Sequence, residues 1–335
     1  RPTVQNNGAW KMKFATTIKY AAIAGALATT SNATAGVSAT AYLELNNLIV
    51  QVDTDGNFTP ENVNPLDFIA VVVDAGSREV NTFSNYNGEL ASDAPPKFEA
   101  TEAANAQLVC SGSSCGVLGL SDNMQSVDSG NIVASDAFNF AAADVNVSGS
   151  ALGTGASGFT YADAGISGGN NETAAATSNI ANDIITRMTF TTLASINVRF
   201  QAFMDYLIDA IISDDIAADP TIKGSASAKA TFGLELSNSD TGAAVDIDST
   251  NGGDGLTFGD NAQDRVGRGN LVSFSGNDEE FLSGWATLAA NTEYQLVITQ
   301  TSNVQASLVP APTTLAIAAF GLLGLGMTAR RKKYM

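Results

Sequence analysis

The stretch Ser195–Asp215, SINVRFQAFMDYLIDAIISDD, decides how the middle of the chain folds. Its first half alternates apolar with polar side chains, which is typical of a strand with one buried face. The apolar members are Ile196, Val198 and Phe200, and the polar members are Asn197, Arg199 and Gln201. Its second half has apolar residues at helical spacing, namely Phe203, Leu207, Ala210 and Ile211. This spacing predicts a short helix across one face of the fold.

Strand-like segments recur on both sides of this stretch. They are separated by clusters of Asn, Asp, Gly and Ser, and they lie at 41–53, 67–74, 228–237 and 294–302. The Ala- and Gly-rich centre, from 141 to 182, is either a long loop or a Gly-rich strand with weak register. Many short strands with Gly-rich turns predict a mainly β body with sandwich or jelly-roll architecture.

Charge is divided unevenly along the 335 residues. There are 34 acidic and 16 basic residues, and no acid lies before Gly36 or after Leu308. Half of the basic residues lie in these two end segments, so the middle keeps eight basic against 34 acidic residues, a formal charge of −26. Such a body repels nucleic acid and anionic membrane surfaces, and we expect no nucleic-acid partner.

Histidine is absent, which removes the commonest general base and the commonest transition-metal ligand. Ser-His-Asp and Cys-His nucleophile systems are therefore excluded within this chain. A carboxylate pair could still hydrolyse a glycosidic bond, but nothing singles out one pair among the many acids. We therefore expect the protein not to be an enzyme.

The two cysteines, Cys110 and Cys115, lie in LVCSGSSCGVL with four residues between them. This is not the C-x-x-C spacing of redox or zinc motifs, and no histidine or second cysteine pair completes a metal site. In an exported protein the spacing predicts a small disulfide loop that pins a turn. The alternative is two free thiols in a loop.

Residues 12–35 have the three-part layout of a secretory signal peptide. A basic region is followed by a short apolar run, which as a helix is too short to span a bilayer easily. The small residues Ala33 and Ala35 fit a cleavage site that leaves Gly36 as the new N-terminus. A buried first helix is the alternative. Residues 1–11, which precede Met12, are interpreted as an upstream artefact.

The last segment, 309–335, joins a proline pair, an apolar run and a basic cluster. The run 315–329 is uncharged and would be about 22 Å long as a helix, against a bilayer core of about 30 Å. We expect a transmembrane-like helix here, with the basic cluster on the cytoplasmic side. The signal peptide is basic on the same side, so the acidic middle is left outside. A buried core helix is the alternative.

This three-part tail resembles a PEP-CTERM sorting signal, which is carried by exported proteins of Gram-negative bacteria that make exopolysaccharide. The residues that carry the resemblance are Val309, Pro310, Ala311, Pro312, Arg330, Arg331, Lys332 and Lys333. The resemblance implies processing by an exosortase, a membrane-embedded, transpeptidase-like cysteine protease. The family usually has Glu between the prolines, where this chain has Ala311. The prolines favour extended backbone, which suits a protease cleft.

The body resembles, more loosely, the group known as exosortase-dependent surface proteins. The matching features are the cysteine pair, the step Ala162-Asp163-Ala164, FGLELSNSDTG and GWATLAANTEYQLVITQTS. The group has no established molecular activity, so this resemblance implies location and fold only.

Two acidic loops are candidates for calcium, which takes six to eight oxygen ligands. The denser loop, VDIDSTNGGDG, offers Asp246, Asp248, Asn251 and Asp254. The second, VDTDGN, offers Asp53, Asp55 and Asn57, but Glu61 comes too early for the bidentate ligand of an EF-hand loop. The alternative for both loops is a solvated polar turn. No other cofactor is expected.

Two further motifs have ordinary explanations. Residues 153–158 spell G-x-G-x-x-G, but the residues after this motif do not begin a helix, so we expect a flexible loop rather than a dinucleotide site. Trp285 could stack on a sugar, but GWATL lies in a strand pattern that favours a place in the core.

Together these features predict an exported, non-enzymatic protein of the cell surface or biofilm matrix. Its body would be residues 36–308, and its partners would be the Sec machinery, an exosortase and, transiently, the inner membrane. The alternative is a carbohydrate-binding β-sandwich, calcium-assisted or not, that acts on exopolysaccharide.

Overall fold

The computed structural model describes residues 36–61, 63–71, 77–95, 103–117, 120–123, 139–153, 155–167, 176–212, 222–247, 255–262 and 270–310. The predicted signal peptide, the residues before it and the tail from 311 onward lie outside these ranges. Within the described ranges, no helix is long and apolar enough to cross a membrane.

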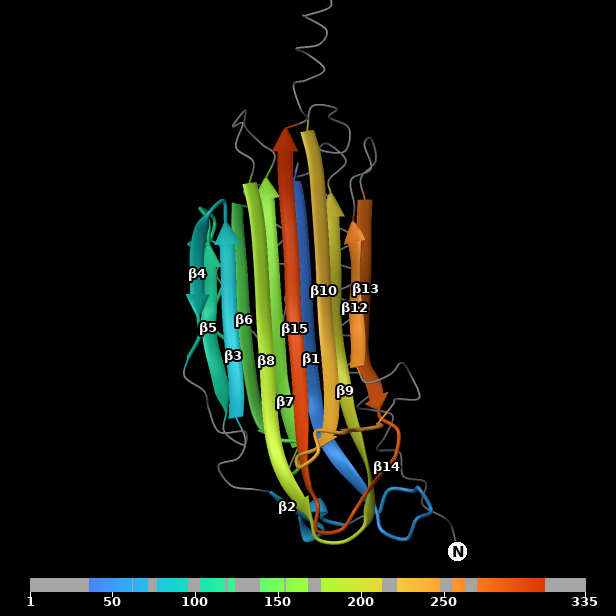
Figure 1. Ribbon diagram of the computed structural model, residues 1–335. Coiled ribbons are helices and arrows are strands. Elements are labelled where there is room, and N and C mark those ends of the chain that lie inside the picture. The colour runs from blue at the N-terminus through green and yellow to red at the C-terminus, as the bar shows by residue number, and fades with distance from the viewer. Residues whose placement is uncertain are drawn as a thin grey trace, which may run out of the picture.

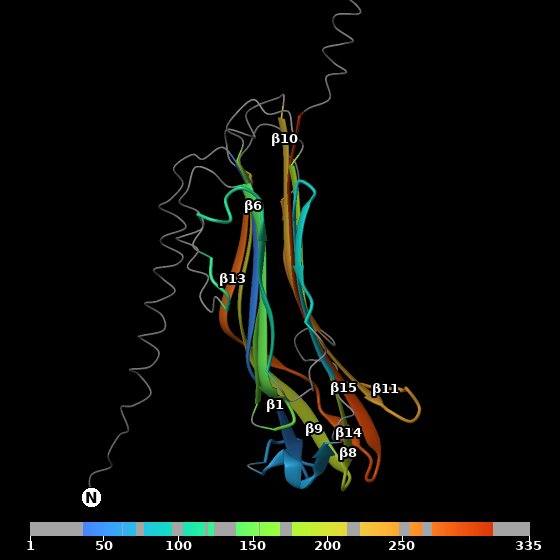
Figure 2. The same ribbon diagram turned by 90° about the vertical axis from the view of Figure 1, so that its left-hand side faces the viewer.

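Two antiparallel sheets make up the body, and they lie face to face as two layers (Figure 2). In sheet A the strand order is β13-β9-β1-β7-β6-β5, with β14 paired to β9. Its strands are β1 (Gly36–Asp53), β5 (Ala104–Ser111), β6 (Asn139–Ser150), β7 (Gly155–Ser167), β9 (Ile196–Ile212), β13 (Asn270–Leu282) and β14 (Ala286–Leu288). The prediction of a mainly β body is confirmed.

In sheet B the strand order is β11-β10-β15-β8-β3-β4, with β12 paired to β10 and β2 paired to β8. Its strands are β2 (Ile69–Val71), β3 (Ser77–Tyr86), β4 (Glu89–Asp93), β8 (Ala176–Thr192), β10 (Ile222–Asn238), β11 (Ala244–Val245), β12 (Gly255–Ala262) and β15 (Glu293–Pro310). A single 3-10 turn, η1 (Pro65–Asp67), precedes β2.

The short helix predicted within the stretch 203–211 is wrong, because β9 continues through it as one strand from Ile196 to Ile212. Every second residue of this strand is apolar and faces the space between the sheets or packs against it: Ile196, Val198, Phe200, Ala202, Met204, Tyr206, Ile208, Ala210 and Ile212. The residues that suggested a helix come from both faces of the strand. Ala210 faces the core, whereas Phe203 and Leu207 lie on the outer face. An unbroken period of two is the pattern of a strand.

The Gly-rich centre forms strands rather than a long loop, and β6 and β7 pair as a hairpin. Gly149 lies in the left-handed region at φ 75°, and a Cβ there would lie 2.1 Å from the carbonyl oxygen of Gly155. Only glycine therefore fits the turn. The G-x-G-x-x-G motif spans this turn and the start of β7 (Gly155–Ser167), and a strand follows it where a dinucleotide site needs a helix.

The core between the sheets combines apolar packing with a few buried polar bonds. Phe232 of β10 and Phe281 of β13 pack edge to face, with ring centroids 5.1 Å apart. The side-chain amide of Gln300 donates to the carbonyl oxygen of Leu43 at 2.6 Å, and Thr160 hydrogen-bonds Ser302 at 2.8 Å. These bonds join β15 of sheet B to β1 and β7 of sheet A, so the relative position of the sheets is fixed as well as their contact.

The first residue of β1 and the last of β15 lie at the same end of the sandwich, at the top of Figure 1. Gly36 pairs with Ser167, and Pro310 pairs with Ile222 at the start of β10. We call this the near end. The far end carries the loop 54–61, η1 and the turn at 193–195 (Figure 1).

The two faces of β9 make a direct prediction. In Phe200→Ala, the free energy of unfolding should fall by about 3–5 kcal/mol, because the side chain is fully buried and leaves a cavity. The matched variant Phe203→Ala removes the same side chain from the outer face and should cost about 1 kcal/mol.

Urea unfolding of both variants measures the difference. A helix over 203–211 with Phe203 toward the core would give the reverse order, and that result would contradict the strand.

Candidate functional site

The outer face of sheet A carries a row of polar and aromatic side chains near the far end, which we call the strip. Arg199 Nε donates to Gln51 Oε1 at 2.7 Å, Gln51 Nε2 donates to Gln201 Oε1 at 2.5 Å, and Gln201 Nε2 donates to Glu280 Oε1 at 2.6 Å. The strip consists of Gln51 of β1, Arg199 and Gln201 of β9, Glu280 of β13, Trp285 just before β14, and Phe58 of the loop after β1. It therefore crosses three neighbouring strands.

Trp285 ends the strip, held between a cation and a second aromatic ring. The guanidinium carbon of Arg199 lies 4.7 Å from the centroid of the indole ring, a cation–π contact. The ring of Phe58 lies 6.4 Å away, tilted by 60°. Trp285 is half-buried rather than part of the core cluster, so its expected place in the core is not where the structure puts it.

Phe58 is presented to Trp285 by a polar network at the end of β1. Asp53 is buried, and its carboxylate accepts the backbone N–H groups of Gly56 and Phe58, both at 3.0 Å. Asn197 Nδ2 donates to the same carboxylate at 2.8 Å, and Thr287 donates to Asn197 Oδ1 at 2.6 Å. The loop that follows β1 is thereby tied to β9 and β14, and it leaves the Phe58 ring 55% exposed.

The charge of Asp53 is required by this network. Burial alone raises the pKa of the carboxyl, but donation from Asn197, Phe58 and Gly56 outweighs burial and lowers the pKa to about 2. Asp53 is therefore ionised under ordinary conditions. Its contribution to stability is present above its unfolded value near 3.8 and is lost as pH falls toward 2.

The same loop brings together a group of carboxylates that could hold a cation: Asp53, Asp55 and Glu61. Glu61, which its spacing excluded as an EF-hand ligand, folds back and accepts Thr54 N at 2.9 Å and Asp55 N at 3.3 Å. Asn57 instead donates to Asp55 at 2.8 Å. Oxygens of all three carboxylates already accept N–H or O–H donors of the protein, so an ion would compete with these bonds.

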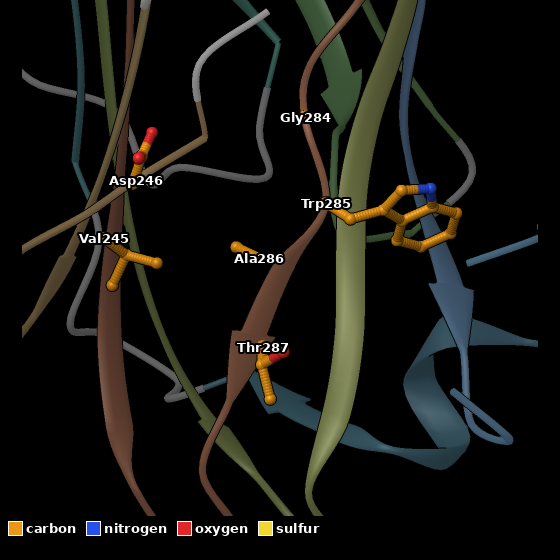
Figure 3. Close-up of a pocket in the computed structure, with 6 residues that line it drawn as sticks. All are labelled: Val245, Asp246, Gly284, Trp285, Ala286 and Thr287. Carbon is orange, nitrogen blue, oxygen red and sulfur yellow. The ribbon is translucent and has the colours of Figure 1, made fainter. Parts of the chain in front are cut away.

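The denser acidic loop is described only in part. Asp246 is exposed and lines an open cavity of about 440 Å³ together with Val245, Gly284, Trp285, Ala286 and Thr287. The other three predicted ligands, Asp248, Asn251 and Asp254, lie outside the described residues. Figure 3 shows the Trp285 ring pointing away from Val245 and Asp246. The cavity and the strip therefore meet at Trp285, whose backbone segment lines the cavity while its ring points away from Val245 and Asp246.

The remaining predicted site residues fall in two groups. Cys110 and Cys115 form a disulfide at the end of β5. Val309 and Pro310 of the sorting motif are the last two residues of β15 and pair with Lys223 and Ile222. The other members lie outside the described residues: Ala33, Ala35, Ala311, Pro312, Arg330, Arg331, Lys332 and Lys333.

A second group of titratable side chains lies closer to the near end of sheet A and is shielded from solvent. Asp163 of β7 and Asp209 of β9 flank Thr40 of β1, and they are 1% and 4% exposed. Thr40 and Tyr161 donate to Asp163 at 3.0 and 2.9 Å. Burial raises the pKa of Asp163 to about 7; these hydrogen bonds oppose the rise, and the charge of Asp209 adds to it. Asp144 on β6 is also buried and bears on Tyr161.

Sequence reasoning missed most of the strip, although the signal was present. Gln51, Arg199 and Gln201 all lay in segments interpreted as strands, at positions opposite to the buried ones. Their common face follows from the pairing of Gln51 with Arg199 across β1 and β9, which no pattern within one segment reveals. Phe58 directly follows the loop VDTDGN, which was singled out for its acids alone, and Glu280 comes from a strand that was not predicted.

Comparison with known proteins adds little to this geometry. No protein-family model matches the chain, and no curated protein does. Among solved structures, the VP2 subviral particle of infectious bursal disease virus matches with 13% identity over 91% of this chain and 90% of that chain, at a TM-score of 0.10. T=1 particles derived from infectious bursal virus match with 10% identity over 83% and 78%, also at 0.10. Such scores carry no argument about fold or function.

The buried carboxyl Asp163 predicts how stability depends on pH. The folded protein keeps a proton on Asp163 up to about pH 7, whereas the unfolded chain releases it near 3.8. Stability should therefore fall as pH rises between these values, by on the order of 3 kcal/mol. Asp163→Asn should flatten the slope in urea unfolding at pH 4.5 to 7.5.

The control is Asp240→Asn, on an exposed turn, which should keep the slope of the unchanged protein. Equal slopes for Asp163→Asn and the unchanged protein would contradict the assignment.

Proposed function

We propose that the chain is an exported, non-enzymatic protein of a bacterial surface or biofilm matrix. The Sec machinery would export it, the C-terminal tail would hold it briefly in the inner membrane, and an exosortase would then process the tail. The observation that supports this most is the position of Gly36 and Pro310 at one end of the sandwich (Figure 1).

Both proposed cleavage points are compatible with an intact fold. Signal cleavage after Ala35 would leave Gly36 as the first residue of β1, paired with Ser167. Cleavage within or just after the proline pair would leave β15 paired to β10 and β8 through Leu308. Processing would thus release a complete sandwich, and its near end would face the membrane until then.

The distribution of charge agrees with this orientation. Both end segments are basic and lack acids, while the body between them has a formal charge of −26 from eight basic and 34 acidic residues. Basic flanks are retained on the cytoplasmic side, and an anionic body is repelled by anionic headgroups. Both effects are met if the acidic body lies outside the inner membrane and is tethered to it at the near end.

The buried carboxylates support a non-enzymatic body. Asp163 has the raised pKa that a general acid needs, and Asp209 is a nearby second acid. Both are sealed within the outer face of sheet A, at 1% and 4% exposure, so a polymeric substrate does not reach them. The same sealing explains the pKa of Asp163 without a catalytic role.

A second candidate, a carbohydrate-binding sandwich, is favoured by the strip. An exposed Phe58 and a half-buried Trp285, beside amide and carboxylate side chains, make the arrangement that sugar recognition needs. This candidate is compatible with export and concerns what the body does once it is outside. A calcium-assisted form would use Asp53, Asp55 and Glu61, beside Phe58.

The intact mass of the protein recovered from its native cells tests the proposal. We expect a polypeptide that begins at Gly36 and ends near Pro310–Pro312, because signal peptidase and exosortase would have removed both basic ends. Recovery of a chain that still ends at Met335 would refute processing and leave a plain tail anchor.

A further inference from the structure

We propose that the strip binds a neutral polysaccharide, with Trp285 and Phe58 against the sugar rings and Gln51, Gln201 and Glu280 toward their hydroxyl groups. This goes beyond export and processing and gives the body an activity. It deepens the carbohydrate-binding candidate of the proposed function, on which it rests, by naming the class of polymer and the side chains that bind it. The orientation of the strip toward the matrix rests on the proposed export.

The polar half of the strip is ordered and still has hydrogen-bonding capacity. The bonds from Arg199 through Gln51 and Gln201 to Glu280 hold both amides in one orientation. In this series of hydrogen bonds each amide donates one N–H. Each amide therefore keeps a second N–H and a second carbonyl lone pair for a ligand. A row of donors and acceptors with fixed direction suits vicinal hydroxyls, and little side-chain entropy is lost on binding.

The aromatic half supplies the apolar contact that sugar recognition also needs. A pyranose ring has a C–H face, which packs on an aromatic ring in the way that apolar groups do. Phe58 is 55% exposed, and Trp285 is half-buried beside it. The Asp53 network and the guanidinium of Arg199 hold both rings in place, so the platform is preorganised.

Charge excludes the acidic polymers. Asp278, Glu279 and Glu280 are exposed on β13 at one end of the strip, and the body as a whole is strongly acidic. A polymer of uronic acids or sulfated sugars would be repelled at long range, as nucleic acid would be. Arg199 is the one cation among these side chains, and its guanidinium already donates to Gln51 and lies against Trp285. A neutral, hydroxyl-rich chain meets no such repulsion.

The shape and position of the strip suit a polymer. The strip crosses three paired strands on the outer face of sheet A, where an extended polymer can lie across the strands. It lies about 50 Å along β1 from Gly36, because Gln51 follows Gly36 by fifteen residue steps of strand. With the near end toward the membrane, the strip would face the surrounding matrix.

Equilibrium binding of the full chain to polysaccharide-coated beads tests the proposal. The probes are three neutral polymers (a β-1,4-glucan, an α-1,4-glucan and a galactomannan) and the anionic polymer alginate. We expect retention on at least one neutral polymer and none on alginate. Trp285→Ala should weaken that binding about tenfold, and Gln201→Ala, which leaves the rings in place, about fivefold. The matched control Phe83→Ala removes a half-buried aromatic ring from the strand β3 of sheet B and should bind as the unchanged protein does.

Three results would overturn the proposal. The first is no retention on any neutral polymer, the second is equal retention of Trp285→Ala and the unchanged protein, and the third is preference for alginate. A fourth result would also overturn it: a dimer in sedimentation that Trp285→Ala dissociates, which would assign the strip to a second copy of the chain. The intact-mass measurement is independent, since a processed protein that binds no glycan refutes only the strip, and an unprocessed chain that binds one refutes only the processing.

Discussion

The period of two along β9 is the constraint on which the rest of the structure depends. One strand of seventeen residues supplies nine positions to the core side of sheet A, and its other face carries Arg199 and Gln201. Its register with β1 brings Gln51 opposite Arg199, and its register with β14 brings Asn197 opposite Thr287. A slip of one residue would exchange the faces, exposing Phe200 and burying a guanidinium, so core and strip are specified together.

The two ends of the sandwich differ in chemistry, and the difference has a physical basis. At the far end, buried Asp53 organises the loop after β1 through three donors and places Phe58 beside Trp285. At the near end lie Gly36, the first described residue of β1, and Pro310, the last described residue of β15. Polar bonds across the core, such as Gln300 to Leu43, keep the sheets in one relative position between the two ends.

The sequence was sufficient for the fold class and insufficient for the site. Alternation and turn residues predicted a mainly β body, because strand patterns and Gly-rich turns are local signals. The predicted helix failed because Phe203, Leu207 and Ile211 are apolar on the outer face, where Leu207 packs in a second cluster with Tyr42 and Tyr161. A strand with apolar residues on both faces can show apolar residues at helical spacing. Only its pairing with neighbouring strands distinguishes such a strand from a helix. The strip joins residues up to 234 positions apart, from Gln51 to Trp285, and its existence depends on strand pairing that no local pattern contains.

The core and the strip both require β9 to be a single strand whose odd-numbered residues face outward near the far end. A cysteine-accessibility scan measures this directly, because both native cysteines are engaged in the disulfide and do not react with a maleimide. Single cysteines at 198 to 205 should react quickly at 199, 201, 203 and 205 and slowly at 198, 200, 202 and 204. Reactivity that instead repeats every three to four residues would contradict the strand, and with it the strip.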